Sequence, residues 1–401
     1  MMKKILPVLL SLIFLSASIV YVAGSDKNDT ESERSEPQSF DVPKRQEEMS
    51  GVWVTYMTLD VENESDKESA FKEKVDAVIG DMKSIDLNTM IVQVRPFCDA
   101  LYPSRYFPWS HILTGTQGKD PGFDPLQYII DAAHENNIMV HAWVNPYRIS
   151  TKNTPSDLSS DHPYKKDNSI GVEVNGSLYL NPASDKTVQL IADGAKELAQ
   201  DYEIDGIQFD DYFYPPDCGD FDASDYEAYC AQTDQPLSLD EFRKQNVSRM
   251  VKEVYQAIHK TGKNTVFGIS PQGNLKNNEG LYADVITWCA EKGYIDYICP
   301  QIYFSLDNPA LTFEHGLQDW LHMEKHQNLA LYIGIPAYKA GTDADGGTWL
   351  DNDDILTTEI EITREKKTDG FMLYSYDSFH NEDNEAEIQN VIRYLTTSPT
   401  Q

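Results

Sequence analysis

The chain has 401 residues, 40% of them hydrophobic, and a formal net charge of −32. Its length and hydrophobic share suit one large globular domain and not a fibrous or disordered chain. The acidic composition excludes nucleic acid and other polyanions as tight ligands, because no basic stripe is present to neutralise phosphates.

The chain begins with a targeting pattern. Two lysines precede an apolar run that ends at Ala23, and small residues follow it. This pattern predicts a signal peptide over residues 1–24, with an uncleaved membrane anchor as the alternative. Residues 25–48 are polar and lack apolar periodicity, which predicts a disordered linker. We therefore expect a folded domain over 49–398 that is secreted or envelope-associated, and that touches the membrane only through its N-terminal segment.

Short apolar runs recur eight times after Glu48. Each is rich in Val, Ile, Phe or Tyr, as expected of strands covered on both faces. They are Gly51–Tyr56, Met90–Arg95, Met139–Asn145, Gly206–Phe213, Val266–Ser270, Tyr297–Tyr303, Ala330–Pro336 and Gly370–Tyr376.

Helical spacing separates these runs. Examples are the apolar positions from Phe71 to Ile85 and those from Phe242 to Ile258, the latter after a capping box at Ser238. Eight strand–helix repeats predict an α/β fold, a (β/α)₈ TIM barrel. An open doubly wound sheet is the alternative, but no glycine-rich phosphate turn follows the first strand. Long insertions after the third and fourth strands are expected to enlarge the carboxyl face.

Five cysteines are present. Cys218 and Cys230 lie in one loop and could pair in an oxidising compartment. Cys98, Cys289 and Cys299 lie in or beside apolar runs and are expected to be buried thiols. No spacing indicates zinc, and we expect neither a metal nor a cofactor.

The fourth strand ends in a pair of acids, Asp210 and Asp211, before Pro215-Pro216 stops the strand. Buried carboxylates are costly unless they are hydrogen-bonded or used, and active sites of α/β barrels lie at the carboxyl ends of the strands. Asp210 is the first catalytic candidate. Alternation places Asp211 on the opposite face, where it orients neighbours, binds a hydroxyl or takes part in catalysis.

Amides, aromatics, an imidazole and arginines gather at the other strand ends and resemble a sugar site. The predicted substrate-binding residues are Gln93, Arg95, His141, Trp143, Asn145, Tyr147, Arg148, Tyr212, Asn274, Gln301 and Tyr303. His141 has a second interpretation, as a hydrogen-bonded histidine in the barrel core. A buried Arg95 needs a partner, and Asp210 is one that would then stay ionised.

Glycoside hydrolysis needs two carboxyl groups. The candidates for the partner of Asp210 are Asp377, with a loop cap as its alternative role, and Asp99, with turn formation as its alternative. No Glu stands at any strand end.

Several ordered motifs resemble the bacterial glycosyl-hydrolase-like family 10. They include Gln93-Val94-Arg95-Pro96, His141-Ala142-Trp143-Val144-Asn145-Pro146-Tyr147-Arg148, Phe209-Asp210-Asp211-Tyr212-Phe213-Tyr214-Pro215, Gly268-Ile269-Ser270-Pro271 and Pro300-Gln301-Ile302-Tyr303. Cys98 departs from the pattern, where a small residue such as Gly is expected. The resemblance implies a TIM-barrel glycosidase of the bacterial envelope that cleaves peptidoglycan strands, preferably peptide-free ones.

Two functions remain open on the sequence. The first is a glycoside hydrolase that acts on cell-wall polysaccharide through carboxylate chemistry centred on Asp210. The second is a carbohydrate-binding or scaffold protein with a degenerate site, which the all-Asp acid set favours.

Overall fold

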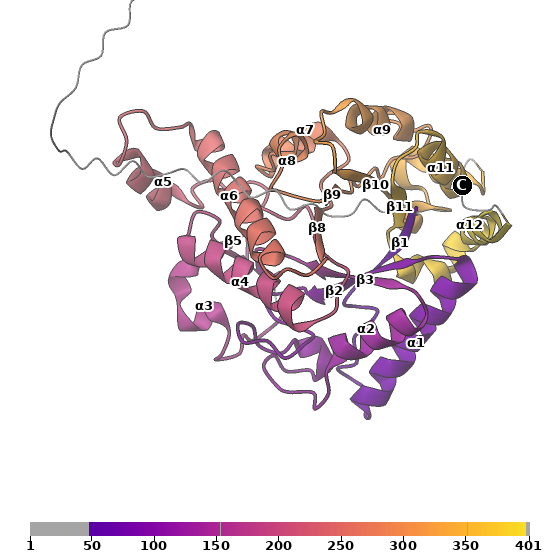
Figure 1. The fold of residues 1–401 in the computed structure, drawn as a ribbon, viewed down its shortest axis with the longest axis horizontal. Helices are drawn as coiled ribbons and strands as arrows, with labels where there is room; N and C mark the ends of the chain where they lie inside the picture. The colour runs from indigo at the N-terminus through magenta and orange to yellow at the C-terminus, as the bar shows by residue number, and fades with distance from the viewer. Residues whose placement is uncertain (1–47, 153, 351, 398–401) are drawn as a thin grey trace, which may run out of the picture. The chain divides into compact units, whose positions relative to one another are not determined.

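A computed structural model describes residues 48–152, 154–350 and 352–397. Parallel strands of this part close into a barrel in the order β1-β11-β10-β9-β8-β7-β3-β2 (Figure 1). They are β1 Met49–Val54, β2 Thr89–Arg95, β3 Met139–Val144, β7 Gly206–Phe209, β8 Val266–Ile269, β9 Tyr297–Ile298, β10 Ala330–Ile335 and β11 Gly370–Leu373. The closed parallel barrel confirms the predicted (β/α)₈ fold and excludes an open sheet.

Several strands are shorter than their apolar runs. β7 ends at Phe209, and β9 is only two residues long. Beyond β9 the ladder continues as isolated bridges that join Gln301 to Gln272 on one side and to Gly334 on the other. The regular side-chain alternation of a strand therefore stops before the residues that reach the mouth.

Helices surround the strands, and capping side chains that the sequence supplies begin several of them. Asp66 caps α1 and Asp124 caps α2, with Pro125 in the first turn, while Ser238 accepts from the backbone N–H of Glu241 at the start of α6. Such caps each stabilise a helix by about 1 kcal/mol. The longer helices are α1 Lys67–Ile85, α2 Pro125–Glu135, α4 Asp185–Asp201, α6 Leu239–His259, α9 Phe313–His322, α11 Ile355–Glu365 and α12 Glu385–Thr397, and α7 Leu275–Gly280 with α8 Val285–Ala290 follow β8.

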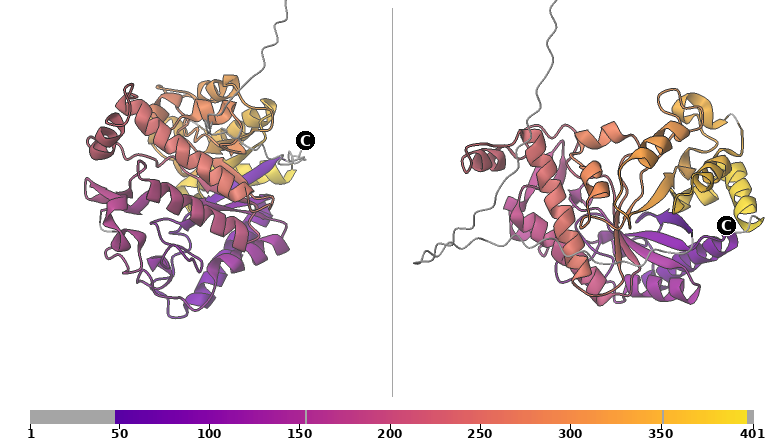
Figure 2. Two further views of the ribbon diagram at one scale, coloured as in Figure 1. Left: turned by 60° about the vertical axis from the view of Figure 1, so that its left-hand side comes forward. Right: turned by 45° about the horizontal axis from the view of Figure 1, so that its top comes forward.

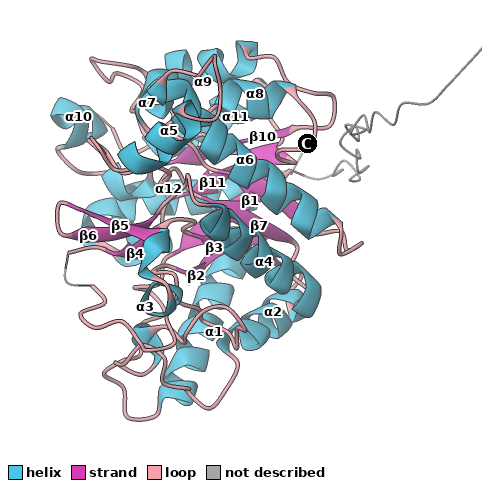
Figure 3. Ribbon diagram, turned by 90° about the vertical axis from the view of Figure 1, so that its left-hand side faces the viewer, coloured by secondary structure: helices cyan, strands magenta, loops and turns pink. Residues whose placement is uncertain are grey.

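Long insertions enlarge the carboxyl face after β3 and β7, as predicted. The first holds α3 Pro163–Lys166 and a sheet of β4 Arg148–Ser150, β6 Ser177–Leu180 and β5 Gly171–Val174 (Figure 3). The second holds α5 Ala223–Cys230, which lies against the start of α6, away from the barrel strands (Figure 2). A third insertion, after β10, holds α10 Ala344–Gly347 and was not predicted.

Large side chains fill the barrel interior. Trp53, Trp143, Tyr297, Tyr332 and Met372 belong to one buried cluster there. At Gly268 a Cβ would lie 2.2 Å from the ring of Tyr297, so β8 needs a glycine beside that ring. Below the mouth the interior is therefore a packed core and not a channel.

Other sequence expectations have mixed outcomes. Cys98, Cys289 and Cys299 are buried, as expected, whereas Cys218 and Cys230 are free thiols and form no bridge. The predicted signal peptide and almost all of the linker lie outside the described residues. Within the described ranges, no helix is long and apolar enough to cross a membrane.

Candidate active site

A cavity of about 380 Å³ opens at the carboxyl ends of the barrel strands. Each barrel strand except β2 contributes lining residues, either from its own carboxyl end or from the loop that follows it. This is the arrangement of a barrel active site. The lining residues are Trp53, Trp143, Asp210, Asp211, Tyr212, Ser270, Gln272, Asn277, Gln301, Tyr303, Phe304, Tyr338, Lys339 and Tyr374.

Asp210 lies immediately after β7 and is only 5% exposed. Its Oδ2 accepts hydrogen bonds from the indole N–H of Trp143, at 3.1 Å, and from the side-chain amide of Asn145. Its Oδ1 accepts from the backbone N–H of Tyr212 at 3.3 Å. Fixed N–H donors thus surround the carboxyl group and stabilise the carboxylate that remains once it gives up a proton.

A chain of polar contacts sets the orientation of Asn145. Its Oδ1 accepts from Gln93 Nε2 at 2.6 Å and from Arg148 Nη2 at 2.7 Å, so its NH₂ group faces Asp210. Gln93 is itself held by the backbone N–H of Tyr56 at 3.1 Å. None of these three side chains lines the cavity. Gln93 and Arg148 therefore orient Asn145, and Asn145 in turn orients the carboxyl group of Asp210.

Asp211 also lines the cavity, which corrects the prediction that it leaves by the opposite face. The prediction failed because β7 ends at Phe209, before the acids. Gln301 Nε2 donates to Asp211 Oδ1 at 2.8 Å, and Gln272 Nε2 donates to Oδ2. The loops that carry these two glutamines approach closely at Gly273, where a Cβ would lie 2.2 Å from the carbonyl oxygen of Gln301.

Burial changes the pKa of both acids in the same direction. Burial, and after it the negative charge of Asp211, raises the pKa of Asp210 to about 7, against the opposing charge of Arg148. Burial also raises the pKa of Asp211, although donation from Gln272 and Gln301 counteracts it. Asp210 can therefore carry a proton near neutral pH, as a general acid must.

Aromatic rings form the other walls of the cavity. Tyr303 stacks on Tyr374 with ring centroids 5.7 Å apart, and Tyr338 meets both rings edge-on. Tyr338 is 43% exposed and Tyr212 is 53% exposed, so both offer ring surface to a ligand. Such faces suit the C–H faces of sugar rings.

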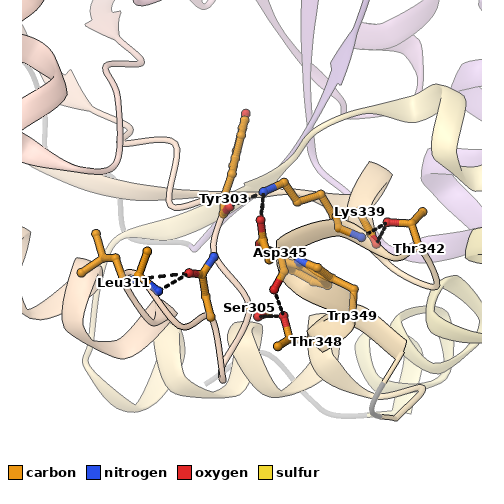
Figure 4. Close-up of polar contacts among 11 residues, drawn as sticks. Tyr303, Ser305, Leu311, Lys339, Thr342, Asp345, Thr348 and Trp349 are labelled. Carbon is orange, nitrogen blue, oxygen red and sulfur yellow. Dashed lines mark hydrogen bonds and ion pairs between the residues drawn. The ribbon is translucent and has the colours of Figure 1, made fainter.

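The insertion after β10 fixes this aromatic wall. Lys339 Nζ donates to the carbonyl oxygen of Tyr303 at 2.8 Å and pairs with Asp345 at 2.9 Å (Figure 4). Trp349 Nε1 donates to the same carboxylate at 2.8 Å. Lys339 also lines the cavity, so the network joins the insertion directly to the site.

Arg95 does not pair with Asp210, contrary to the prediction. A register irregularity between Gln93 and Arg95 pairs Arg95 with Val144 of β3 and turns it away from the barrel interior. Its guanidinium lies 4.4 Å from the ring centroid of Phe107. A bulge of this kind breaks the period of two on which the prediction depended.

Three other predicted binding residues lie away from the cavity lining. His141 is buried in the barrel, with Nδ1 3.0 Å from the hydroxyl of Tyr297, which confirms its second interpretation as a core histidine. Tyr147 is fully buried in the core outside the barrel. Asn274 caps α7 by accepting from the backbone N–H of Lys276 at 3.0 Å.

The two candidate partner acids do not line the cavity either. Asp99 is fully buried, and its oxygens accept from the backbone N–H of Phe97 at 3.2 Å and from Gln117 at 3.1 Å. Asp377 accepts from the hydroxyls of Thr55 and Thr58 at 3.2 and 2.8 Å, which ties the loop after β11 to the loop after β1. Both carboxylates therefore hold loops together outside the cavity lining.

Sequence reasoning placed no substrate-binding residue on the loops after β10 and β11. Tyr338, Lys339 and Tyr374 line the cavity and were absent from the predicted binding set, as was Gln272. The signal was available, because all four follow strand ends. Among the described residues, no group of three or more His, Cys, Asp or Glu side chains could hold a metal ion.

The barrel and its cavity define a fold shared with glycosidases. The glycoside hydrolase domain of PgaB (BpsB) from Bordetella bronchiseptica has a TM-score of 0.54 over 86% of this chain and 99% of that chain, at 12% identity. The endo-1,4-beta-mannanase from Rhizomucor miehei has a TM-score of 0.52 over 91% of this chain and 99% of that chain, at 11% identity. At these identities the likeness shows the fold alone.

The family follows from the sequence comparisons. Residues 48–351 match the glycosyl hydrolase-like 10 family, and the chain belongs to it. It is 36% identical to glycosyl hydrolase YngK of Bacillus subtilis over 79% of this chain and 66% of that protein, just under two thirds of the relative's length. It is 29% identical to glycosyl hydrolase DigH of Escherichia coli over 72% of this chain and 71% of that protein.

Proposed function

We propose that this protein is an exported glycoside hydrolase that cleaves bacterial cell-wall glycan, with peptide-free peptidoglycan strands as its preferred substrate. The observation that carries the proposal is a buried Asp210, with a pKa of about 7, at the rim of a cavity lined by aromatics and amides. A general acid works best when its pKa lies near the working pH. A site that only bound sugar would gain nothing from a half-protonated buried carboxyl group.

The cavity chemistry supports an uncharged, hydroxylated ligand. Gln272, Asn277 and Gln301 offer amides, and Tyr303 and Tyr374 offer ring faces. The motifs of the family and the names of the relatives support glycan hydrolysis. Export is supported by the N-terminal targeting pattern and by the expected location of a cell-wall substrate.

The test uses purified full-length protein on peptide-free glycan strands and on intact sacculi, with the products separated and weighed by mass spectrometry. The protein is expected to release oligosaccharides from the bare strands faster than from the sacculi. The Asp210→Asn variant should lose at least about 10²-fold in kcat, because it removes the proton donor but keeps the shape.

Asp377→Asn is the matched control, since that carboxylate lies outside the cavity lining and should leave kcat unchanged. Thermal unfolding of each variant shows whether it folds. If folded Asp210→Asn cleaves as fast as the unmodified protein, the assignment of the acid is wrong. If no glycan is cleaved by either protein, hydrolysis of cell-wall glycan is wrong.

A further inference from the structure

Both carboxylates of the cavity come from one strand end. Among the described residues that line the cavity, the acids are Asp210 and Asp211, consecutive in the chain after β7. The usual glycosidase pair flanks the sugar, with one carboxyl group protonating the glycosidic oxygen and the other attacking the anomeric carbon or activating water for it. Two acids on one strand end approach the ring from one side of the barrel.

The opposite side of the barrel presents a ring in place of an acid. In the closed order β1-β11-β10-β9-β8-β7-β3-β2, β11 stands four strands from β7 in either direction. The residue that follows β11 and lines the cavity is Tyr374, flanked by Trp53 from β1 and Tyr338 from the loop after β10. Asp377, the nearest acid along that loop, is engaged by the hydroxyls of Thr55 and Thr58.

We infer that the nucleophile belongs to the substrate: the cavity binds a sugar with a 2-acetamido group, and the carbonyl oxygen of that group attacks the anomeric carbon. The inference rests on the proposed function and deepens it, because it names the sugar class and the mechanism. Hydrolases assisted by their substrate in this way are known exceptions to the two-carboxylate rule. They need one carboxyl group to protonate the leaving oxygen and a neighbouring one to hold the acetamido N–H.

The hydrogen bonds divide these two roles. Asp211 is anchored by Gln272 and by Gln301, whose amide also donates to the carbonyl oxygen of Ser270 at 2.9 Å. A carboxylate offers about four lone-pair sites, so Asp211 can still accept the acetamido N–H. Its fixed negative charge favours the proton on Asp210, whose conjugate base Trp143 and Asn145 then stabilise.

The reaction balances without any further reagent. Asp210 gives its proton to the glycosidic oxygen, the bond from that oxygen to C1 breaks, and the acetamido carbonyl oxygen bonds to C1 to form a bicyclic oxazolinium. Asp211 holds the acetamido N–H and stabilises the positive charge. Water then attacks C1 and gives a proton to Asp210, the bond from C1 to the acetamido oxygen breaks, and the sugar is released with its anomeric configuration retained.

The size of the cavity fits this arrangement. Its volume of about 380 Å³ lies near the lower end of the range for ligand pockets, roughly 300–1,000 Å³. That is room for one sugar ring with its acetamido group, while neighbouring sugars of a strand would lie on the exposed rings of Tyr212 and Tyr338.

The first test compares two forms of one substrate with the full-length protein. Peptide-free glycan strands are assayed before and after chemical de-N-acetylation, at saturating concentration, and the anomer first released is identified by proton NMR. Loss of the acetamido nucleophile should lower kcat by at least about 10²-fold, and the intact substrate should yield the retained anomer. Equal turnover of both forms, or an inverted product, would overturn the inference and leave the proposed function standing.

The second test does not depend on cleavage. A thiazoline fused across C1 and C2 of N-acetylglucosamine mimics the bicyclic intermediate and should bind at least about 10²-fold more tightly than N-acetylglucosamine itself. Asp211→Asn should weaken thiazoline binding, and the matched variant Asp377→Asn should not. If the thiazoline binds no better than the simple sugar, the inference fails even where glycan is cleaved.

Discussion

The indole N–H of Trp143 donates to the proposed general acid Asp210, and its removal should shift the pH dependence of the proposed hydrolysis in a calculable direction. In Trp143→Phe the 3.1 Å donation to Asp210 Oδ2 is lost. That donation favours the ionised carboxyl group and is worth about 1.5–3 kcal/mol. At about 1.4 kcal/mol per pKa unit, its loss raises the pKa of Asp210 by about 1–2 units from its starting value of about 7.

The sign of the effect follows from the role of the acid. In the proposed role of general acid, Asp210 acts only when protonated. The value of kcat/KM should then fall as the pH rises through the pKa of Asp210, and a higher pKa should move this limb to higher pH. The assay is the pH profile of kcat/KM on peptide-free glycan strands. Trp53→Phe is the matched control, because that indole lines the same cavity but donates to Gln208 at 2.6 Å and to no carboxylate. An unmoved limb in Trp143→Phe, or an equal shift in both variants, refutes the reasoning.

Three further predictions concern stability. Asp99→Asn should lower the free energy of unfolding by about 1–3 kcal/mol, because the new NH₂ group would face one of the two buried N–H donors that now bind the carboxylate. Asp377→Asn should lower it by less. Urea unfolding measures both changes, and a loss of kcat in the folded variant would return that acid to the catalytic candidates. Asp210→Asn should change stability more favourably at pH 8 than at pH 4. The new amide faces the same N–H donors at both pH values, whereas the cost of ionising a carboxyl group whose pKa is raised from 3.8 to about 7 is nearly absent at pH 4 and almost complete at pH 8. Thermal unfolding at the two pH values checks this, and an equal shift at both contradicts it. Glu359→Gln should be more stable than the unmodified protein at pH 8. Glu359 is fully buried, its carboxyl oxygens have no hydrogen-bond partner among the described residues, and burial raises its pKa well above the usual range. A variant less stable than the unmodified protein at pH 8 would show that the carboxyl group has a partner.

The barrel was predictable because its signals are local. Eight apolar runs, each covered on both faces, and helix caps such as Asp124 with Pro125 depend only on nearby residues. The cavity position of Asp210 was predictable by the same logic, since a carboxylate at the end of a buried strand must be hydrogen-bonded or used. The chain positions alone were enough to place it at the carboxyl face of the barrel.

The errors in placing site residues have two physical causes. Face assignments assumed unbroken alternation, but the irregularity after Gln93 reverses Arg95, and the early end of β7 lets Asp211 reach the cavity. Which acids lie in the cavity is also a tertiary property. Nothing local shows that Asp377 is engaged by Thr55, a residue more than three hundred positions away in the chain.

Gly273 makes the site sensitive to substitution at a position outside the cavity lining. It is not a lining residue, yet a methyl group there would collide with the carbonyl oxygen of Gln301 at 2.2 Å and push the two glutamine-bearing loops apart. A saturation screen for lost turnover should therefore recover this position alongside the acids themselves. Inhibitor design, by contrast, gains nothing by reaching for it, since the position matters for how closely two backbones meet and not for any contact with a bound molecule.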